Sequence, residues 1–210
     1  MLRIAIVDYD SGNLHSVCKG LQYVGAEPIV TDSPAVMAAA DAVVLPGVGS
    51  FDPAMQHLQK RDLIEPLRRI ATSGQPFLGI CLGLQLLFES SAEGSAEGLG
   101  ILAGRVQRFR STPGLTIPHM GWNQLELAQP NCPLWQDLAP AAWMYFVHSF
   151  YVKPQDALVT SALITHGDQQ VTVAVARDNL QAVQFHPEKS AQAGLQVLAN
   201  FLKTVPVRMT

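Results

Sequence analysis

Apolar and polar positions in the first half of the chain alternate between two periods. Four short apolar runs have the length of buried strands, whereas the segments between them repeat apolar residues with the 3.6-residue period of a helix face. The strands are predicted at residues 2–7, 28–30, 41–45 and 77–80. The helices are predicted at residues 14–24, from 34 onward, and, with interruptions, at 52–72. Because parallel strands are usually joined through a helix, this alternation predicts a parallel sheet flanked by helices.

The pattern changes after residue 89. A Ser/Gly/Glu-rich loop at residues 90–100 is followed by short segments of strand character, which turn signals such as Pro113-Gly114 separate. These segments are residues 106–109, 122–127, 143–147, 158–164, 171–176 and 182–185. A helix at 191–202 closes the chain, and no linker or repeat divides it. We therefore predict one α/β domain over residues 1–210, with an open, mixed, mainly parallel sheet and extra β-rich strands in its second half.

Composition narrows the class of protein. Of the 210 residues, 48% are hydrophobic and 15% charged, which is typical of a folded globular chain. The net charge is −3, and the absence of a basic block argues against nucleic acid or a membrane surface as a partner. Cys18, Cys81 and Cys132 are odd in number and widely spaced, so they predict neither a metal site nor a disulfide framework. We expect a cytoplasmic protein without a metal or cofactor.

The sequence Gly-Ile-Cys-Leu-Gly at residues 79–83 joins a predicted strand to a predicted helix. Glycine on both sides of Cys81 allows the sharp turn of a nucleophile elbow, which exposes the sulfur at the strand end. The helix N-terminus there favours a thiolate, and the N–H of Leu82 points to where an oxyanion would form. The alternative is that Cys81 is a small buried core residue, as most free cysteines are.

The sequence His186-Pro187-Glu188 follows a run of strand character. Pro187 biases the preceding residue toward extended backbone, in which residues two apart share a side. The Glu188 carboxylate can then orient the His186 imidazole, which is the base that a cysteine nucleophile needs. Alone, this sequence fits a surface turn with a solvated glutamate better than it fits a catalytic pair. Together with Cys81, it predicts a nucleophile, a base and an orienting acid.

Residues 79–85, Gly-Ile-Cys-Leu-Gly-Leu-Gln, together with His-Pro-Glu at 186–188, resemble the class I (triad) glutamine amidotransferases, which have a flavodoxin-like fold. The resemblance implies that Cys81 attacks the γ-amide of glutamine and forms a glutamyl thioester. It implies that His186 passes the proton to the leaving ammonia while Glu188 orients the imidazole. Water then releases glutamate.

The same resemblance implies the residues of the glutamine pocket. The N–H groups of Val48 and Leu82 form the oxyanion hole, after a peptide flip in the glycine-containing loop at 46–49. The substrate is held by Gly49, Gln85, Glu93 and Ser149. Solvated positions are the alternative for Gln85 and Glu93. Ser149 replaces a threonine that is commoner in the family, and both carry a hydroxyl.

Five further stretches resemble the glutaminase subunits of imidazole glycerol phosphate synthases: residues 8–13, 46–51, 118–123, 145–149 and 186–190. This resemblance implies a heterodimer with a (β/α)₈ cyclase subunit. The glutaminase supplies ammonia to that subunit, which makes imidazole glycerol phosphate and aminoimidazole carboxamide ribotide in histidine biosynthesis. The positions implied to face the cyclase are Asn13, Trp122, Asn123 and Lys189.

Several alternatives stay open. A core position is the alternative for Trp122, and both Trp135 and Trp143 are predicted to be core. Tyr145, His119 and His148 lie in matching stretches but receive no role. The alternative functions are the glutaminase subunit of another synthase and a non-catalytic binding module of the same fold. A stress-type or peptidase-like cysteine enzyme is disfavoured, since these tend to carry histidine where this chain has Leu82.

Overall fold

Five parallel strands form one half of the main sheet in the computed structural model, which describes residues 1–206. In spatial order they are β2 (Glu27–Thr31), β1 (Arg3–Val7), β3 (Ala42–Gly47), β4 (Phe77–Cys81) and β13 (Leu180–Val183). Every residue of β3, β4 and β13 is buried, as expected for parallel strands that are covered on both faces. The predicted parallel sheet is therefore confirmed.

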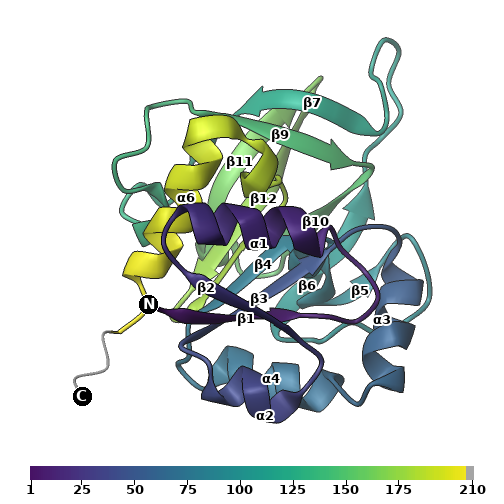
Figure 1. Cartoon of the computed structure of the whole chain (residues 1–210). Coiled ribbons are helices and arrows are strands. Elements are labelled where there is room, and N and C mark those ends of the chain that lie inside the picture. The colour runs from purple at the N-terminus through teal and green to yellow at the C-terminus, as the bar shows by residue number, and fades with distance from the viewer. Residues whose placement is uncertain (207–210) are drawn as a thin grey trace.

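Two helical layers cover this part of the sheet (Figure 1). One layer consists of α1 (Leu14–Tyr23) and α6 (Ala191–Lys203), which contact each other. The other layer consists of α2 (Pro34–Ala39), α3 (Phe51–Lys60) and α4 (Ile64–Thr72). The strand residues alternate between two apolar clusters: Ile4 and Ile6 pack with α1 and α6, whereas Ala5 and Val7 pack with α2, α3 and α4. The sheet therefore separates two cores.

The second half of the chain extends the sheet mostly with antiparallel pairs. After β13 the order continues through β12 (Gln169–Arg177), β10 (Phe150–Pro154), β6 (Leu102–Arg108) and β5 (Phe88–Ser91). A branch of β11 (Thr160–His166) and β8 (Glu126–Leu127) pairs with β12, and β7 (His119–Gln124) pairs with β9 (Trp143–His148) in a separate two-stranded sheet. Three short 3₁₀ helices, Pro133–Trp135, Ala157–Val159 and Pro187–Lys189, complete the described elements.

The structure differs from the sequence-based elements in three places. The helix after Cys81, α5 (Leu82–Leu86), is short. The backbone N–H of Leu99 bonds to the Leu86 carbonyl, those of Ile101 and Leu102 bond to the Leu87 carbonyl, and the chain from Phe88 onward forms β5. The helix predicted with interruptions at 52–72 is two separate helices, divided where Asp62 has a φ of 53°. The strand β10 was not predicted. Each difference arises from contacts that are distant in sequence or from an unfavourable backbone angle.

Two predicted core tryptophans have different outcomes. Trp135 is 3% exposed and donates its indole N–H to Ser161, which confirms the prediction. Trp143 is 52% exposed, so the prediction was wrong; its sheet face carries no covering layer in the described structure. Residues 207–210 of the predicted domain lie outside the described residues. Within residues 1–206, no helix has the length and apolarity to cross a membrane, and no group of three metal-ligating side chains is present.

Candidate active site

The turn between β4 and α5 has the backbone of a nucleophile elbow. Cys81 has φ 55° and ψ −110°, an unusual conformation for a residue with a side chain. A Cβ on Gly83 would collide with the Leu45 carbonyl oxygen, and one on Gly79 would lie 2.9 Å from the Cβ of Ala182. Only glycine fits at either position without a shift of the neighbouring strands. The predicted strand–turn–helix around Cys81 is therefore confirmed in geometry.

His186 and Glu188 form a buried pair. Nδ1 of His186 lies 2.9 Å from Oε1 of Glu188, and the two side chains are 3% and 1% exposed. His186 is extended, as predicted, but Glu188 lies in the 3₁₀ helix Pro187–Lys189 rather than in a continued strand. Ser190 fixes this segment, because its hydroxyl donates to the His186 carbonyl at 2.6 Å and accepts the Tyr145 N–H at 2.9 Å.

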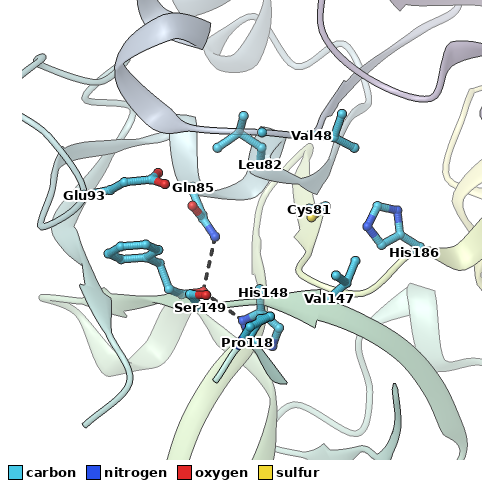
Figure 2. A pocket seen from close by; sticks show the side chains of 12 residues that line it. Val48, Cys81, Leu82, Gln85, Glu93, Pro118, Val147, His148, Ser149 and His186 are labelled. Carbon is cyan, nitrogen blue, oxygen red and sulfur yellow. Dashed lines mark hydrogen bonds between the residues drawn. The ribbon is translucent and has the colours of Figure 1, made fainter. Parts of the chain in front are cut away.

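The environment of His186 favours its protonated form. Burial lowers the pKa of His186, but the Cys81 sulfur and the Glu188 carboxylate outweigh this effect and raise the pKa to about 10. Nε2 makes no hydrogen bond to another described residue, and the imidazole is turned toward Cys81 (Figure 2). A charged imidazolium at this position stabilises negative charge on the neighbouring sulfur.

Cys81 and His186 line one pocket of about 280 Å³ at the carboxyl ends of β3 and β4. All six residues predicted for the oxyanion hole and the substrate line it too: Val48, Leu82, Gly49, Gln85, Glu93 and Ser149. Figure 2 shows these side chains converging from separate elements. Four lining residues were not predicted: Pro118, Val147, His148 and Phe150. Three of the four are neighbours of Ser149 in sequence, and that proximity was the available signal.

Gln184 contacts Cys81 and was missed by the sequence analysis. It is fully buried, and its Nε2 donates to the Cys81 sulfur at 3.6 Å. Its Oε1 accepts from Gln85, whose Nε2 also donates to the Phe150 carbonyl at 3.2 Å. The two amides therefore connect the nucleophile to the wall of the pocket. The available signal was the position of Gln184 two residues before His186, because alternate residues of an extended segment share a side.

The loop at 46–49 is held from outside the pocket. The N–H of Val48 donates to Oγ of Ser11 at 3.4 Å, and the Ser11 hydroxyl donates to the Val48 carbonyl at 2.7 Å. The Tyr9 hydroxyl donates to the Pro46 carbonyl at 2.8 Å, and burial raises the pKa of this phenol well above its ordinary value. Gly49 has a φ of +90°. The Val48 N–H thus bonds to Ser11, and the predicted peptide flip would have to break that bond.

Two histidines without a predicted role form a hydrogen-bonded chain beside the pocket. Nδ1 of His148 donates to the Phe150 carbonyl at 2.8 Å, so its Nε2 accepts from Nδ1 of His119 at 3.2 Å. The amide of Asn123 lies 3.4 Å from the remaining ring nitrogen of His119. Burial lowers the pKa of His148 to about 3 and that of His119 to about 4, so both are neutral near pH 7. The chain fixes the backbone that carries Phe150.

The residues predicted to face a partner lie outside the pocket. Asn13 caps α1 by accepting the Ser16 N–H, and Lys189 is exposed. Trp122 is 48% exposed, and Asn123 donates to the Thr165 carbonyl. Exposed apolar residues share one face of the β7–β9 sheet, because Met120 pairs with Val147, Trp122 with Tyr145, and Gln124 with Trp143. This apolar face is defined by Met120, Trp122 and Trp143.

Comparisons with known proteins agree with this geometry. A family model for class-I glutamine amidotransferases matches residues 5–205. The chain belongs to the class-I glutamine amidotransferase family. A family member from Synechococcus elongatus, the imidazole glycerol phosphate synthase subunit HisH, is 68% identical over 97% of this chain and 94% of its own length. The protein of the same name from a Cyanothece species is 64% identical over 98% and 97% of the two chains.

Solved structures of low sequence identity share the fold. A structure described as a glutamine amidotransferase has a TM-score of 0.74 at 19% identity and covers 97% of this chain and 99% of its own. A chain of PurLQS from Thermotoga maritima has a TM-score of 0.74 at 18% identity and covers 98% of each chain. The relatives and the matched family confirm both resemblances that the motifs indicated.

Proposed function

We propose that this chain hydrolyses glutamine to glutamate and ammonia, and that it delivers the ammonia to a cyclase subunit. The observation that carries the proposal is the convergence of three groups. The sulfur of Cys81 stands on a strained elbow, the imidazole of His186 faces it, and the Glu188 carboxylate lies 2.9 Å behind the imidazole. A nucleophile and a base in one pocket, with an orienting acid buried behind the base, form the set that acyl transfer through a thioester requires.

The reaction follows from these positions. The Cys81 thiolate attacks the side-chain carbonyl carbon of glutamine, and the carbonyl oxygen becomes an oxyanion. When the C–N bond breaks, its electron pair leaves with the nitrogen, which takes a proton from the His186 imidazolium and departs as ammonia. Water then gives a proton to neutral His186 while its oxygen attacks the thioester. The C–S bond breaks, glutamate leaves, and the thiolate and imidazolium are restored.

The oxyanion hole explains why a partner would control the rate. The N–H of Leu82 follows directly after the nucleophile, whereas the N–H of Val48 bonds to Ser11 at 3.4 Å. A peptide flip at 46–49 would release that N–H and give the oxyanion its second donor. One oxyanion donor contributes roughly 100-fold or more to turnover. We infer that glutamine hydrolysis is slow until the partner promotes the flip.

The partner is inferred from the relatives' names and from one surface. The matched relatives are subunits of imidazole glycerol phosphate synthase. We infer that the apolar face on β7–β9, with Asn13, Asn123 and Lys189, contacts a (β/α)₈ cyclase subunit in a heterodimer. Ammonia passing to the cyclase would yield imidazole glycerol phosphate and aminoimidazole carboxamide ribotide in histidine biosynthesis. All three cysteines are free, which agrees with the proposed cytoplasmic location.

Glutamate release, measured with and without the cyclase subunit of a matched relative, tests the proposal. We expect slow release from the chain alone and a large increase when the cyclase is present. Cys81→Ser should abolish release in both conditions, whereas Cys18→Ser, at a half-buried position of α1 that does not line the pocket, should leave both rates unchanged. A glutamine-like alkylating agent should label Cys81 and no other cysteine.

Three results would contradict the proposal in different ways. Release that the cyclase does not change would favour the glutaminase subunit of another synthase. No release in either condition would favour a non-catalytic binding module. Full activity in Cys81→Ser would exclude the proposed nucleophile.

A further inference from the structure

A fully buried glutamine contacts the nucleophile without lining the glutamine pocket. Gln184 is 0% exposed, and its Nε2 lies 3.6 Å from the Cys81 sulfur. It is not among the described residues that line the pocket. A buried side-chain amide is unfavourable unless both of its polar atoms have hydrogen-bond partners. One of the partners of Gln184 is therefore the atom that is proposed to attack glutamine.

The main sheet fixes the side on which this glutamine lies. Its backbone N–H donates to the Val173 carbonyl at 2.7 Å, directly after the end of β13. Val183 and Phe185 belong to the core beneath α1 and α6, whereas Ala182 belongs to the other core. Successive side chains of a strand point to opposite faces, so Gln184 points to the same side as Ala182. This side carries α5, where the amide meets Gln85.

A backbone carbonyl determines which way the two amides face. The Phe150 carbonyl can only accept hydrogen bonds, so the nitrogen of the Gln85 amide must face it, at 3.2 Å. The same nitrogen lies 3.0 Å from the Gln184 amide, which must therefore present its oxygen to Gln85. The nitrogen of Gln184 is left to face Cys81. Nδ1 of His148 donates to the same carbonyl at 2.8 Å and helps to hold it in place.

The orientation of the amide decides which form of the sulfur it favours. An amide nitrogen donates and does not accept, so the sulfur of Cys81 is the acceptor in this contact. A hydrogen bond to the charged form of a group stabilises that form, and here the charged form is the thiolate. A cysteine side chain has about three staggered rotamers, and the bond from Gln184 favours the observed one. In that rotamer the sulfur is next to the imidazole of His186 (Figure 2).

We propose that Gln184 is a positioning residue for the nucleophile, whose amide holds the Cys81 sulfur beside His186 and stabilises the thiolate before glutamine binds. Its consequence for turnover rests on the proposed function, whereas its effect on the sulfur does not. Because Gln184 lies outside the pocket lining, it acts on the reactivity of the sulfur and not on the binding of glutamine.

Alkylation of Cys81 by iodoacetamide in the full chain measures the sulfur directly. The reagent reacts with the thiolate, and mass spectrometry of the digested protein distinguishes Cys81 from Cys18 and Cys132. Gln184→Met removes the donor and keeps the length of the side chain. We expect the midpoint of the labelling rate against pH to rise by about one unit, because the thiolate loses a hydrogen bond. The plateau rate at high pH should not fall, since the thiolate is then fully formed without the amide.

Gln181→Met is the matched control. Gln181 is a buried glutamine of the same strand, 4% exposed, and its Oε1 has no hydrogen-bond partner among the described residues. This variant should keep the wild-type midpoint. Gln184→Glu is a second test, because it keeps an oxygen for Gln85 but places a negative charge beside the sulfur. Its midpoint should rise further than that of Gln184→Met. Thermal melts show which variants are folded, and if one variant of Gln184 does not fold, the other decides.

Glutamate release gives a second readout. At a pH below the wild-type labelling midpoint, Gln184→Met should lower kcat at least threefold, because less of the sulfur is thiolate. KM should stay within about twofold of the wild-type value, because no contact with glutamine is lost. An unchanged labelling midpoint in the folded Gln184 variants would overturn the proposal, as would an equal shift in Gln181→Met. Absence of release from the wild type would count against the proposed function alone, because labelling does not require glutamine turnover.

Discussion

The proposed triad and the 46–49 loop meet at one pocket, where Gly47 is the register partner of Cys81, but they are held in very different ways. His186 and Glu188 are almost fully buried, and backbone and side-chain contacts fix both. Val48 is 43% exposed, and its N–H bonds to a single serine hydroxyl outside the pocket. The proposed nucleophile, base and acid are thus assembled in this chain alone, whereas the N–H of Val48, the proposed second oxyanion donor, bonds to Ser11. Under the proposed function, this contrast places the control of turnover in the loop rather than in the nucleophile.

The largest effect on turnover is expected at the buried pair of His186 and Glu188. Glu188→Gln keeps the shape of the side chain but removes the charge that orients His186 and helps to raise its pKa. We expect turnover to fall roughly 100-fold or more, since a positioned acid–base group contributes about 10² to 10⁴. The loss should be similar with and without the cyclase. A loss confined to the stimulated reaction would show that Glu188 acts through the partner instead.

A smaller effect on turnover, restricted to the cyclase-stimulated reaction, is expected from the loop at residues 46–49. Gly49 has a φ of +90° with open space around it, whereas a Cβ on Gly47 would collide with the Tyr9 hydroxyl. Gly49 is therefore the position at which loop motion can be tested without a steric clash. Gly49→Val should lower the cyclase-stimulated turnover at least tenfold while destabilising the fold by about 1–3 kcal/mol, because a β-branched residue is strained at this φ. Equal losses of basal and stimulated turnover would argue against a flip.

The third prediction concerns the wall formed by the histidine chain. The pKa of His148 is about 3 in the folded protein against an ordinary value of 6.5, so the unfolded chain binds more protons as the pH falls below 6.5. The neutral form contributes its full stability above pH 6.5, and this contribution is lost as the pH falls toward 3. Between pH 6.5 and about 5.5, the loss from this residue is about 1 kcal/mol of unfolding free energy. The pKa of His186 is raised, so its protonated form contributes stability that is fully present below pH 6.5. This contribution is lost as the pH rises from 6.5 to about 10.

Urea unfolding at several pH values measures this effect. The free energy of unfolding of His148→Gln should decline less steeply below pH 6.5 than that of the wild type, while exposed His15→Gln should match the wild type. Carboxylates contribute to all three slopes alike, so the difference reports His148 together with its effect on His119, to which it is hydrogen-bonded. Identical slopes for His148→Gln and the wild type would show that His148 is protonated in the folded protein.

The sequence predicted local geometry well and long-range pairing poorly. The turn at Cys81 follows from glycines within four residues, and the pairing of His186 with Glu188 needs only the intervening proline. The contact between His119 and His148 depends on the register of β7 against β9, which places residues 29 apart opposite each other. The exposure of Trp143 has the same origin, because a tryptophan is buried only when another layer covers its face. Neither of these is encoded in a local pattern.

The smallest effect is expected at Ser11, and it tests the comparison most directly. Its hydroxyl accepts the Val48 N–H and donates to the Val48 carbonyl, so it holds the peptide units on both sides of that residue. Ser11→Ala removes both bonds, each with a net value of about 1 kcal/mol at most for an exposed pair, and it leaves the triad untouched. Basal glutamate release should therefore rise about threefold, while the cyclase-stimulated rate stays the same. A threefold rise means that an energy of RT ln 3, part of that of the lost bonds, no longer adds to the activation barrier. Asp10→Ala is the neighbouring control, since Asp10 pairs with Arg61 and not with the loop. A fall in basal release in Ser11→Ala would mean that the serine supports the active arrangement of the loop, and the loop would then be prepared for catalysis without a partner.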